Sequence, residues 1–102
     1  MEVKRLQSEI VKSMEKWDKL KGKKYSKNAA FAHLVEEVGE LAQEFVHKER
    51  SQSKYNEEKL IDAIGDIFIY VVLLASLFKV DIEQLIVDIL KQDKIRRSRE
   101  GL

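Results

Sequence analysis

Three glutamates, Glu36, Glu37 and Glu40, lie within five residues of one another and are the side chains best suited to chemistry. An α-helix turns about 100° per residue, so Glu37 and Glu40 lie about 60° apart on one face. Like charges at these spacings repel by about 0.2–0.5 kcal/mol per pair, and the sequence has no lysine or arginine between His33 and His47 to balance them. We therefore expect a balancing positive charge from elsewhere.

A second acidic pair, Asp62 and Asp66, lies one helical turn apart just before a long apolar run. Carboxylates are seldom buried unless they are paired or bind a metal. We therefore expect the two acidic segments to face each other across one cation. Gly39 and Gly65 each precede the last acid of their segment, and a close approach of the two backbones is one reason to place glycine inside a helix.

These carboxylates predict a site for a hard cation. The chain has no cysteine, and oxygen ligands on helices suit Mg²⁺ or Mn²⁺ better than Zn²⁺. Magnesium held by few carboxylates keeps positions for water and substrate phosphates, so a phosphate ester or nucleotide is the expected substrate class. The alternative is that the acids are only the solvated faces of two surface helices.

Several neighbouring residues have a structural interpretation that we prefer. His33 and His47 are expected to be surface or supporting residues rather than ligands, and Trp17 to be a core or interface residue rather than a base-stacking one. Glu44 is compatible with a supporting role at the metal or with solvation. The lysine-rich stretch between Lys16 and Lys27 is read as a solvated connector in preference to a flap that meets phosphates.

The elements that must position these residues are helices. The chain has no proline and shows no strand-like alternation, and apolar residues recur at three- and four-residue spacings. We expect an all-α four-helix bundle, a single domain over residues 1–102, with helices at about residues 3–20, 29–48, 57–78 and 82–97. The last helix is expected to bury Ile82, Leu85, Ile86, Ile89 and Leu90. The apolar run of the third helix exceeds what one small bundle covers, so a homodimer or homotetramer is expected.

Composition excludes several other classes. The net charge of +1 provides no field for nucleic acid or for a membrane surface, and the 12-residue apolar run 67–78 is shorter than the roughly 20 residues of a bilayer span. The first residues lack the apolar core of a signal peptide, so we expect a cytoplasmic protein.

The stretch Leu34-Val35-Glu36-Glu37-Val38-Gly39-Glu40-Leu41, followed by Ile64-Gly65-Asp66-Ile67 and Val80-Asp81-Ile82, resembles the MazG-like all-α nucleoside triphosphate pyrophosphohydrolases over about residues 29–97. Their signature is Glu-Glu-x-x-Glu and, after a gap, Glu-x-x-Asp. The resemblance implies that Glu37, Glu40 and Asp66 bind Mg²⁺. The chain departs from the signature at Ala63. Either Asp62, one residue earlier, substitutes for the missing acid, or the site binds the metal with three protein ligands and more water.

This resemblance implies Mg²⁺-dependent hydrolysis of a nucleoside or deoxynucleoside triphosphate to the monophosphate and pyrophosphate, as in housecleaning enzymes. A metal-activated water would attack the α-phosphorus, with Glu36 or Glu37 orienting or deprotonating it. Lys91, Lys94 and Arg97 lie where family members often carry phosphate-contacting residues. Two alternatives remain: a phosphoribosyl-ATP pyrophosphohydrolase, and a metal-free helical interaction module without catalytic activity.

Overall fold

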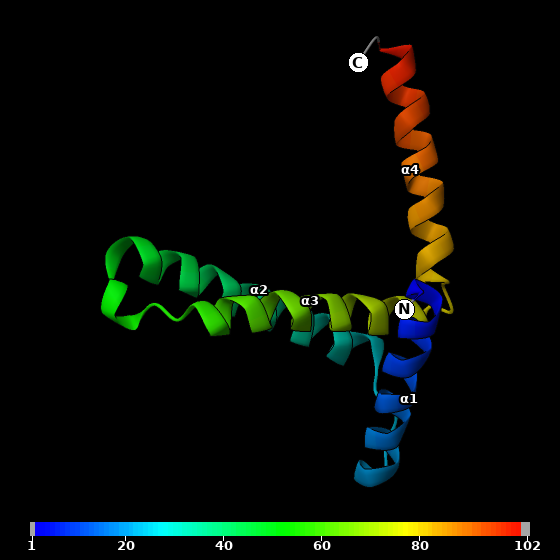
Figure 1. The fold of residues 1–102 in the computed structure, drawn as a ribbon. Coiled ribbons are helices and arrows are strands. Elements are labelled where there is room, and N and C mark those ends of the chain that lie inside the picture. Colours follow the sequence, from blue (N-terminus) through cyan, green and yellow to red (C-terminus); the bar gives the residue numbers. More distant parts are fainter. Residues whose placement is uncertain (1, 101–102) are drawn as a thin grey trace.

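A computed structural model describes residues 2–100 and contains four α-helices (Figure 1). They are α1 (Val3–Lys21), α2 (Lys27–Arg50), α3 (Glu57–Leu77) and α4 (Ile82–Arg99), with a short 3₁₀ helix, η1 (Gln52–Lys54), between α2 and α3. No strand is present in this part of the chain. The all-α prediction is confirmed, and each helix end lies within two residues of the predicted position.

Local sequence signals explain where the helices begin and end. Gly22 ends α1 in the left-handed region, with a φ of 69° that a glycine adopts without strain. Ser26, Asn56 and Asp81 each accept a hydrogen bond from the backbone N–H three residues later, at 3.0, 3.1 and 3.1 Å. Each of these signals depends only on residues a few positions away in the sequence.

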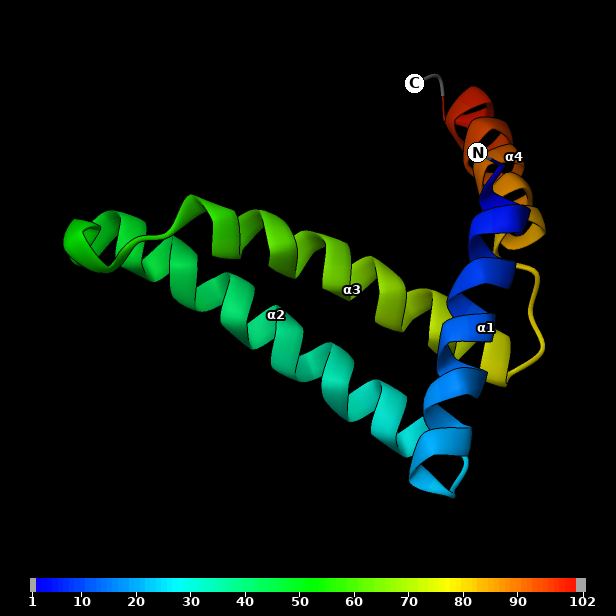
Figure 2. The ribbon, with the colours of Figure 1, turned by 60° about the horizontal axis from the view of Figure 1, so that its bottom comes forward.

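Helices α2 and α3 form an antiparallel hairpin, and α1 lies across the end of it (Figure 2). The small buried core contains Ala30 from α2, Ala63, Val72 and Leu73 from α3, and Ile82 at the start of α4. Both acidic segments therefore lie on the two helices that pack most extensively against each other, which gives the candidate site a rigid support.

Gln7 joins α1 to the turn between α3 and α4. Its side-chain amide donates to the Ser76 hydroxyl and to the Val80 carbonyl, both at 2.9 Å, and its side-chain carbonyl accepts from the Ile82 backbone N–H at 3.1 Å. The three bonds fix the position of α1 against the end of α3. They also satisfy backbone groups next to Ile82, which is buried.

Helix α4 projects away from the hairpin, so the four helices do not close into a bundle within one chain (Figure 1). The radius of gyration is 17.2 Å, whereas a compact domain of this length has about 13 Å. Of the residues expected to be buried on the last helix, only Ile82 is buried in the chain; Leu85, Ile86, Ile89 and Leu90 are exposed. That prediction is wrong for the single chain, because within residues 2–100 α4 projects away from the hairpin and leaves these side chains exposed.

Helix α3 is long and apolar enough to cross a bilayer by length and composition, and only 17% of its most apolar window is buried. The core helix of a soluble protein passes the same test, so this property is weak support for a membrane span. A span over this helix would place Asp62 and Asp66 in hydrocarbon, which is costly. Coverage of its apolar side chains by protein avoids that cost.

Candidate active site

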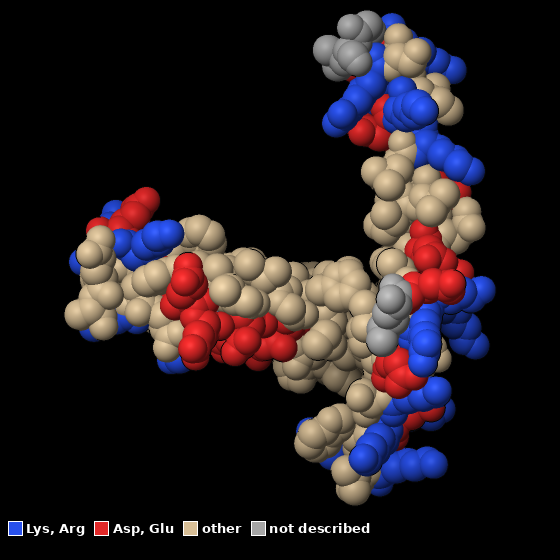
Figure 3. Space-filling view, in the orientation of Figure 1, with Lys and Arg blue, Asp and Glu red and all other residues tan. Residues whose placement is uncertain are grey.

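The acidic residues of α2 and α3 gather in one patch on the hairpin (Figure 3). Burial raises the pKa of Glu37, and the negative charges of Glu40 and Asp66 raise it further. The Oε2 atom of Glu37 is buried and has no hydrogen-bond partner. The two separate acidic segments therefore converge, and at least one carboxylate oxygen there lacks the partner that buried polar atoms normally have.

A cavity of about 350 Å³ opens beside this patch, and we call it the acidic cavity. Glu40 lines it from α2, and Asp62 and Asp66 line it from α3. Ala63, the position at which the sequence departs from the expected signature, is buried in the same wall. Asp62 thus lies on the same cavity as the other acids.

The residues present fit a hard cation. Carboxylate oxygens are the ligands that Mg²⁺ and Mn²⁺ prefer, and the unpartnered Oε2 of Glu37 is a free acceptor among like charges. Within residues 2–100, no three acidic or histidine side chains are already arranged around one point where a metal would sit.

Lys59 is a site residue that sequence reasoning missed. It is the only cationic side chain among the described residues that line the acidic cavity. Its signal was its helical spacing, because Lys59 precedes Asp62 by three residues and Asp66 by seven and so shares their face of α3. It places one positive charge beside the acids.

The two glycines do not mark a close approach of α2 and α3. A Cβ atom added at Gly39 or at Gly65 would meet no atom within 4 Å. The expectation is therefore wrong within the chain, because both glycines face open space rather than the other helix of the hairpin.

Glu44 is a structural residue rather than a solvated one. It is only 7% exposed, and its Oε1 accepts a hydrogen bond from the backbone N–H of Asn56 at 2.9 Å. The His47 Nδ1 lies 3.6 Å from the same oxygen. Glu44 therefore fixes the return of the chain into α3, and His47 has the supporting place expected for it.

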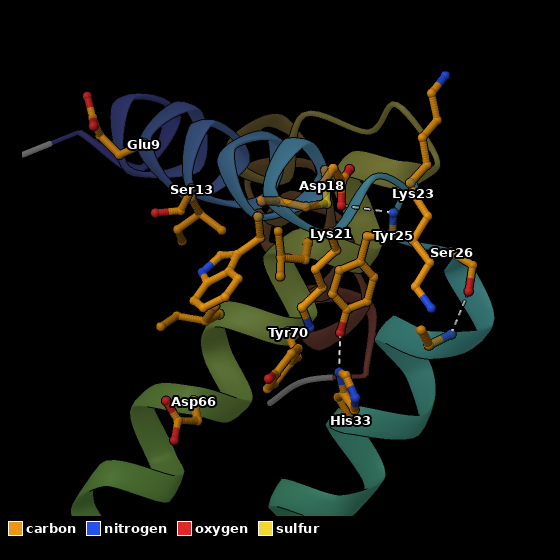
Figure 4. Close-up of a pocket in the computed structure, with 17 residues that line it drawn as sticks. Glu9, Ser13, Asp18, Lys21, Lys23, Tyr25, Ser26, His33, Asp66 and Tyr70 are labelled. Atoms are coloured by element: carbon orange, nitrogen blue, oxygen red, sulfur yellow. Dashed lines mark hydrogen bonds between the residues drawn. The ribbon is translucent and has the colours of Figure 1, made fainter.

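A larger cavity of about 770 Å³ lies between α1, the linker after it and the α2–α3 hairpin (Figure 4). We call it the aromatic cavity because Trp17, Tyr25, His33 and Tyr70 line it. The Tyr25 hydroxyl and the His33 Nδ1 are hydrogen-bonded. Asp66 lines this cavity as well as the acidic one.

The ionisation of both tyrosines in this cavity is suppressed. Burial, the neighbouring Tyr70 and the charge of Glu36 raise the pKa of Tyr25 to about 12. Burial raises the pKa of Tyr70, and the charges of Glu37 and Asp66 raise it further. Glu36 and Glu37 therefore act electrostatically on this cavity as well as on each other. Tyr70 follows Asp66 by one helical turn, which was the sequence signal for its place here.

Two sequence predictions have a different place in the structure. Trp17 is 60% exposed at the aromatic cavity, so it does not belong to the core of the chain. Lys91, Lys94 and Arg97 lie on α4, which projects away from the acidic patch (Figure 3), and Arg97 pairs with Asp93 at 3.1 Å. One chain does not bring these three cations to the acids.

The four helices and the two acidic segments on the α2–α3 hairpin define an all-α protein with a carboxylate-rich site. A family model, described as the MazG nucleotide pyrophosphohydrolase domain, matches residues 25–100. The chain therefore belongs to the MazG nucleotide pyrophosphohydrolase family. Comparison with curated proteins gives no significant match.

Proposed function

We propose that the protein hydrolyses a nucleoside or deoxynucleoside triphosphate to the monophosphate and pyrophosphate, with Mg²⁺ as cofactor and Mn²⁺ as a possible substitute. The observation that carries this proposal is the convergence of Glu37, Glu40 and Asp66, with a buried Glu37 oxygen that lacks a partner. Membership of the MazG family supports the reaction class. The proposed metal and triphosphate rest on the carboxylate chemistry, because carboxylates that hold Mg²⁺ leave positions for substrate phosphates.

Each acidic residue has a proposed part in this reaction. Glu37, Glu40 and Asp66 would hold the cation, with Asp62 as the fourth carboxylate. The cation supplies neutralisation of phosphate charge and a lower pKa for water. Water oxygen attacks the α-phosphorus, the bond from that phosphorus to the bridging oxygen of the β-phosphate breaks, and pyrophosphate leaves with the electron pair. Glu36 or Glu37 accepts the proton that the water loses.

Phosphate contacts come from two sources in this proposal. Lys59 lines the acidic cavity of its own chain. Lys91, Lys94 and Arg97 would have to come from α4 of a second copy, because within one chain α4 points away from the acids (Figure 1). We therefore propose a homodimer or homotetramer acting on a nucleotide in the cytoplasm, without nucleic acid or membrane as partner.

The experiment is an assay of pyrophosphate release from the four deoxynucleoside and four ribonucleoside triphosphates with Mg²⁺ or Mn²⁺. Glu40→Gln and Asp66→Asn should each lower kcat by at least about a hundredfold, because each removes a negative charge from the cation site. Glu49→Gln is the matched control: it lies on α2, is exposed and is outside both cavities. No pyrophosphate from any triphosphate with either metal would refute the proposal.

Two further measurements separate the alternatives. Including phosphoribosyl-ATP in the panel identifies a histidine-pathway type of activity. The exposed apolar face of α4 favours a second candidate, a metal-free interaction module. If the protein is such a module, calorimetry should detect no Mn²⁺ binding, and function should survive both Glu40→Gln and Asp66→Asn. The enzyme proposal predicts that both variants keep the fold and lose Mn²⁺ binding.

A further inference from the structure

The two aspartates of α3 lie differently with respect to α2. At about 100° per residue, Ala63 lies about 60° to one side of Asp66, and Asp62 lies about 40° to the other side. Ala63 is buried, and Leu60 and Ile67, which share its side of the helix, are half-buried. Asp62 is exposed. Asp66 therefore lies at the edge of the surface that packs against α2, whereas Asp62 lies beyond that edge.

Glu37 and Asp62 do not face the same cavity. Asp62 lines the acidic cavity together with Glu40 and Asp66, whereas Glu37 is not one of its lining residues. The Oε2 atom of Glu37, which lacks a hydrogen-bond partner, is buried outside that cavity. Asp62 and this oxygen therefore do not border one common space.

The electrostatics of Glu37 supports the same separation. Burial raises the pKa of Glu37, and the charges of Glu40, Asp66 and Glu36 raise it further. Asp62 is not among these charges, although it lies one helical turn from Asp66. Because Coulombic interaction weakens with distance, Asp62 is farther from Glu37 than those three carboxylates are.

A hard cation does not need a fourth carboxylate. Magnesium requires octahedral geometry with oxygen atoms at about 2.0–2.1 Å, and it keeps several waters instead of exchanging all of them for protein ligands. A carboxylate outside that short distance acts on the cation through hydrogen bonds, and such outer groups orient what binds there. Three carboxylates and water are therefore sufficient without Asp62.

We infer that Glu37, Glu40 and Asp66 are the carboxylate ligands of the cation, and that Asp62 is a positioning residue whose carboxylate accepts hydrogen bonds from water in the acidic cavity. This inference rests on the proposed function and refines it, because the fourth carboxylate acts through water and does not touch the cation. The cavity volume of about 350 Å³ leaves room for that water, since one molecule takes about 30 Å³ in the liquid.

Three variants of α3, spaced one helical turn apart, test this assignment. Glu58→Gln, Asp62→Asn and Asp66→Asn each remove one negative charge, and Glu58 is exposed and lines neither cavity. Mn²⁺ is titrated by calorimetry into the full chain, freed of metal with a chelator and without nucleotide. Asp66→Asn should weaken binding at least about a hundredfold and Asp62→Asn by no more than about tenfold. The control Glu58→Gln should stay within about twofold of the wild type.

A second measurement counts the ligands directly. Pulsed electron paramagnetic resonance of bound Mn²⁺ in heavy water reports how many waters the cation holds. The number should be the same in the wild type and in Asp62→Asn, because Asp62 occupies no coordination position. One additional water in Asp62→Asn would overturn the inference, and so would a loss of affinity as large as that of Asp66→Asn.

The positioning role also predicts a kinetic effect. At saturating Mn²⁺, Asp62→Asn should lower kcat about tenfold with little change in KM for the triphosphate, because the water is still present but is less well oriented. Glu58→Gln should keep wild-type values. A wild-type kcat in Asp62→Asn would overturn the positioning role, since a residue that supports only the fold does not act on kcat of a folded, metal-saturated protein.

The outcomes distinguish this inference from the proposed function. If the wild type binds Mn²⁺ and Asp62→Asn keeps the same number of waters, the ligand assignment holds even when no triphosphate is hydrolysed, and only the proposed reaction fails. If Asp62→Asn gains a water or loses Mn²⁺ while the wild type hydrolyses triphosphates, only the inference fails. A wild type that binds no Mn²⁺ refutes both.

Discussion

At the scale of single residues, the site is governed by charges that lack partners. Glu37 has a raised pKa and a buried carboxylate oxygen without a hydrogen-bond partner. Glu44, on the same helix, is also buried, but its carboxylate accepts a hydrogen bond from the Asn56 backbone N–H. Glu44 therefore stabilises the fold through its hydrogen bond, whereas the buried Glu37 oxygen without a partner destabilises it. A carboxylate with a raised pKa and a buried oxygen that lacks a partner is a candidate for function.

Tyr25 gives a pH-dependent prediction at this scale. Its pKa in the folded chain is about 12, against 10.0 for an ordinary tyrosine, so the unfolded chain loses this proton first as the pH rises. A raised pKa contributes stability that is fully present below about pH 10 and is lost between about pH 10 and pH 12. The groups facing Tyr25 are His33, Tyr70 and Glu36.

The free energy of unfolding in urea should therefore fall more steeply above pH 10 in the wild type than in Tyr25→Phe, whose side chain cannot ionise. Lysine ionisation is common to both proteins and cancels in the difference. Tyr55→Phe, which removes a tyrosine outside both cavities, serves as the control and should follow the wild type. Parallel curves for the wild type and Tyr25→Phe would contradict the raised pKa.

At the scale of the elements, α1 is held to the rest of the chain by few contacts, and Gln7 provides three of its hydrogen bonds. Gln7→Ala leaves the backbone N–H of buried Ile82 and the Val80 carbonyl without these partners. Unfolding free energy should fall by about 1–3 kcal/mol, which is the cost of leaving buried polar groups unsatisfied.

Chemical denaturation at one fixed protein concentration measures this loss. Ser8→Ala, an exposed change on the same helix, should stay within about 0.5 kcal/mol of the wild type. A stability equal to that of Ser8→Ala would mean that α1 is positioned by other contacts.

The elements also show which parts of this protein the sequence predicts. The helix ends were predicted to within two residues, because the caps at Gly22, Ser26, Asn56 and Asp81 depend on neighbours a few residues away. The facing of Glu37 and Glu40 toward Asp66 was predicted because helical spacing puts each set of acids on one face.

The remaining features depend on contacts between elements. Trp17 and the apolar stripe of α4 were expected to be covered, yet periodicity shows only which residues share a face and not what lies against it. The edge-to-face packing of Tyr25, His33 and Tyr70 was not predicted, because it depends on the path of the linker and on the register of α2 against α3. Lys59 and Tyr70 were nonetheless within reach, since each shares a helix face with Asp66.

At the scale of the whole molecule, one chain exposes too much surface. Its accessible area is 8351 Å², whereas a folded monomer of 11.9 kDa has about 5,900 Å². The excess of about 2,400 Å² is larger than the roughly 800 Å² per partner of a standard interface. Exposed apolar residues are spread over the outer faces of α2 and α3, as at Val38 and Ile64, and along α4, as at Leu85 and Leu90.

This surface predicts an obligate homo-oligomer in which the apolar faces of two copies cover each other. Light scattering after size-exclusion chromatography should give at least twice 11.9 kDa, with no monomer at micromolar concentrations. Ile64→Glu on the hairpin and Leu85→Glu on α4 should each shift the protein toward a monomer and reduce its stability, because each places a charge in an apolar interface. Gln52→Glu adds the same charge on exposed η1 and should leave the mass unchanged.

The two variants also test how assembly and site are connected. If α4 of a second copy supplies Lys91, Lys94 and Arg97, Leu85→Glu should raise KM for the triphosphate. Mn²⁺ binding depends on the acids of one hairpin, so it should persist in any folded monomer. A wild-type mass of 11.9 kDa at all concentrations would refute the assembly. The open arrangement of α4 would then be the state in which the protein binds its substrate, and Lys59 would be the cation left to contact the phosphates.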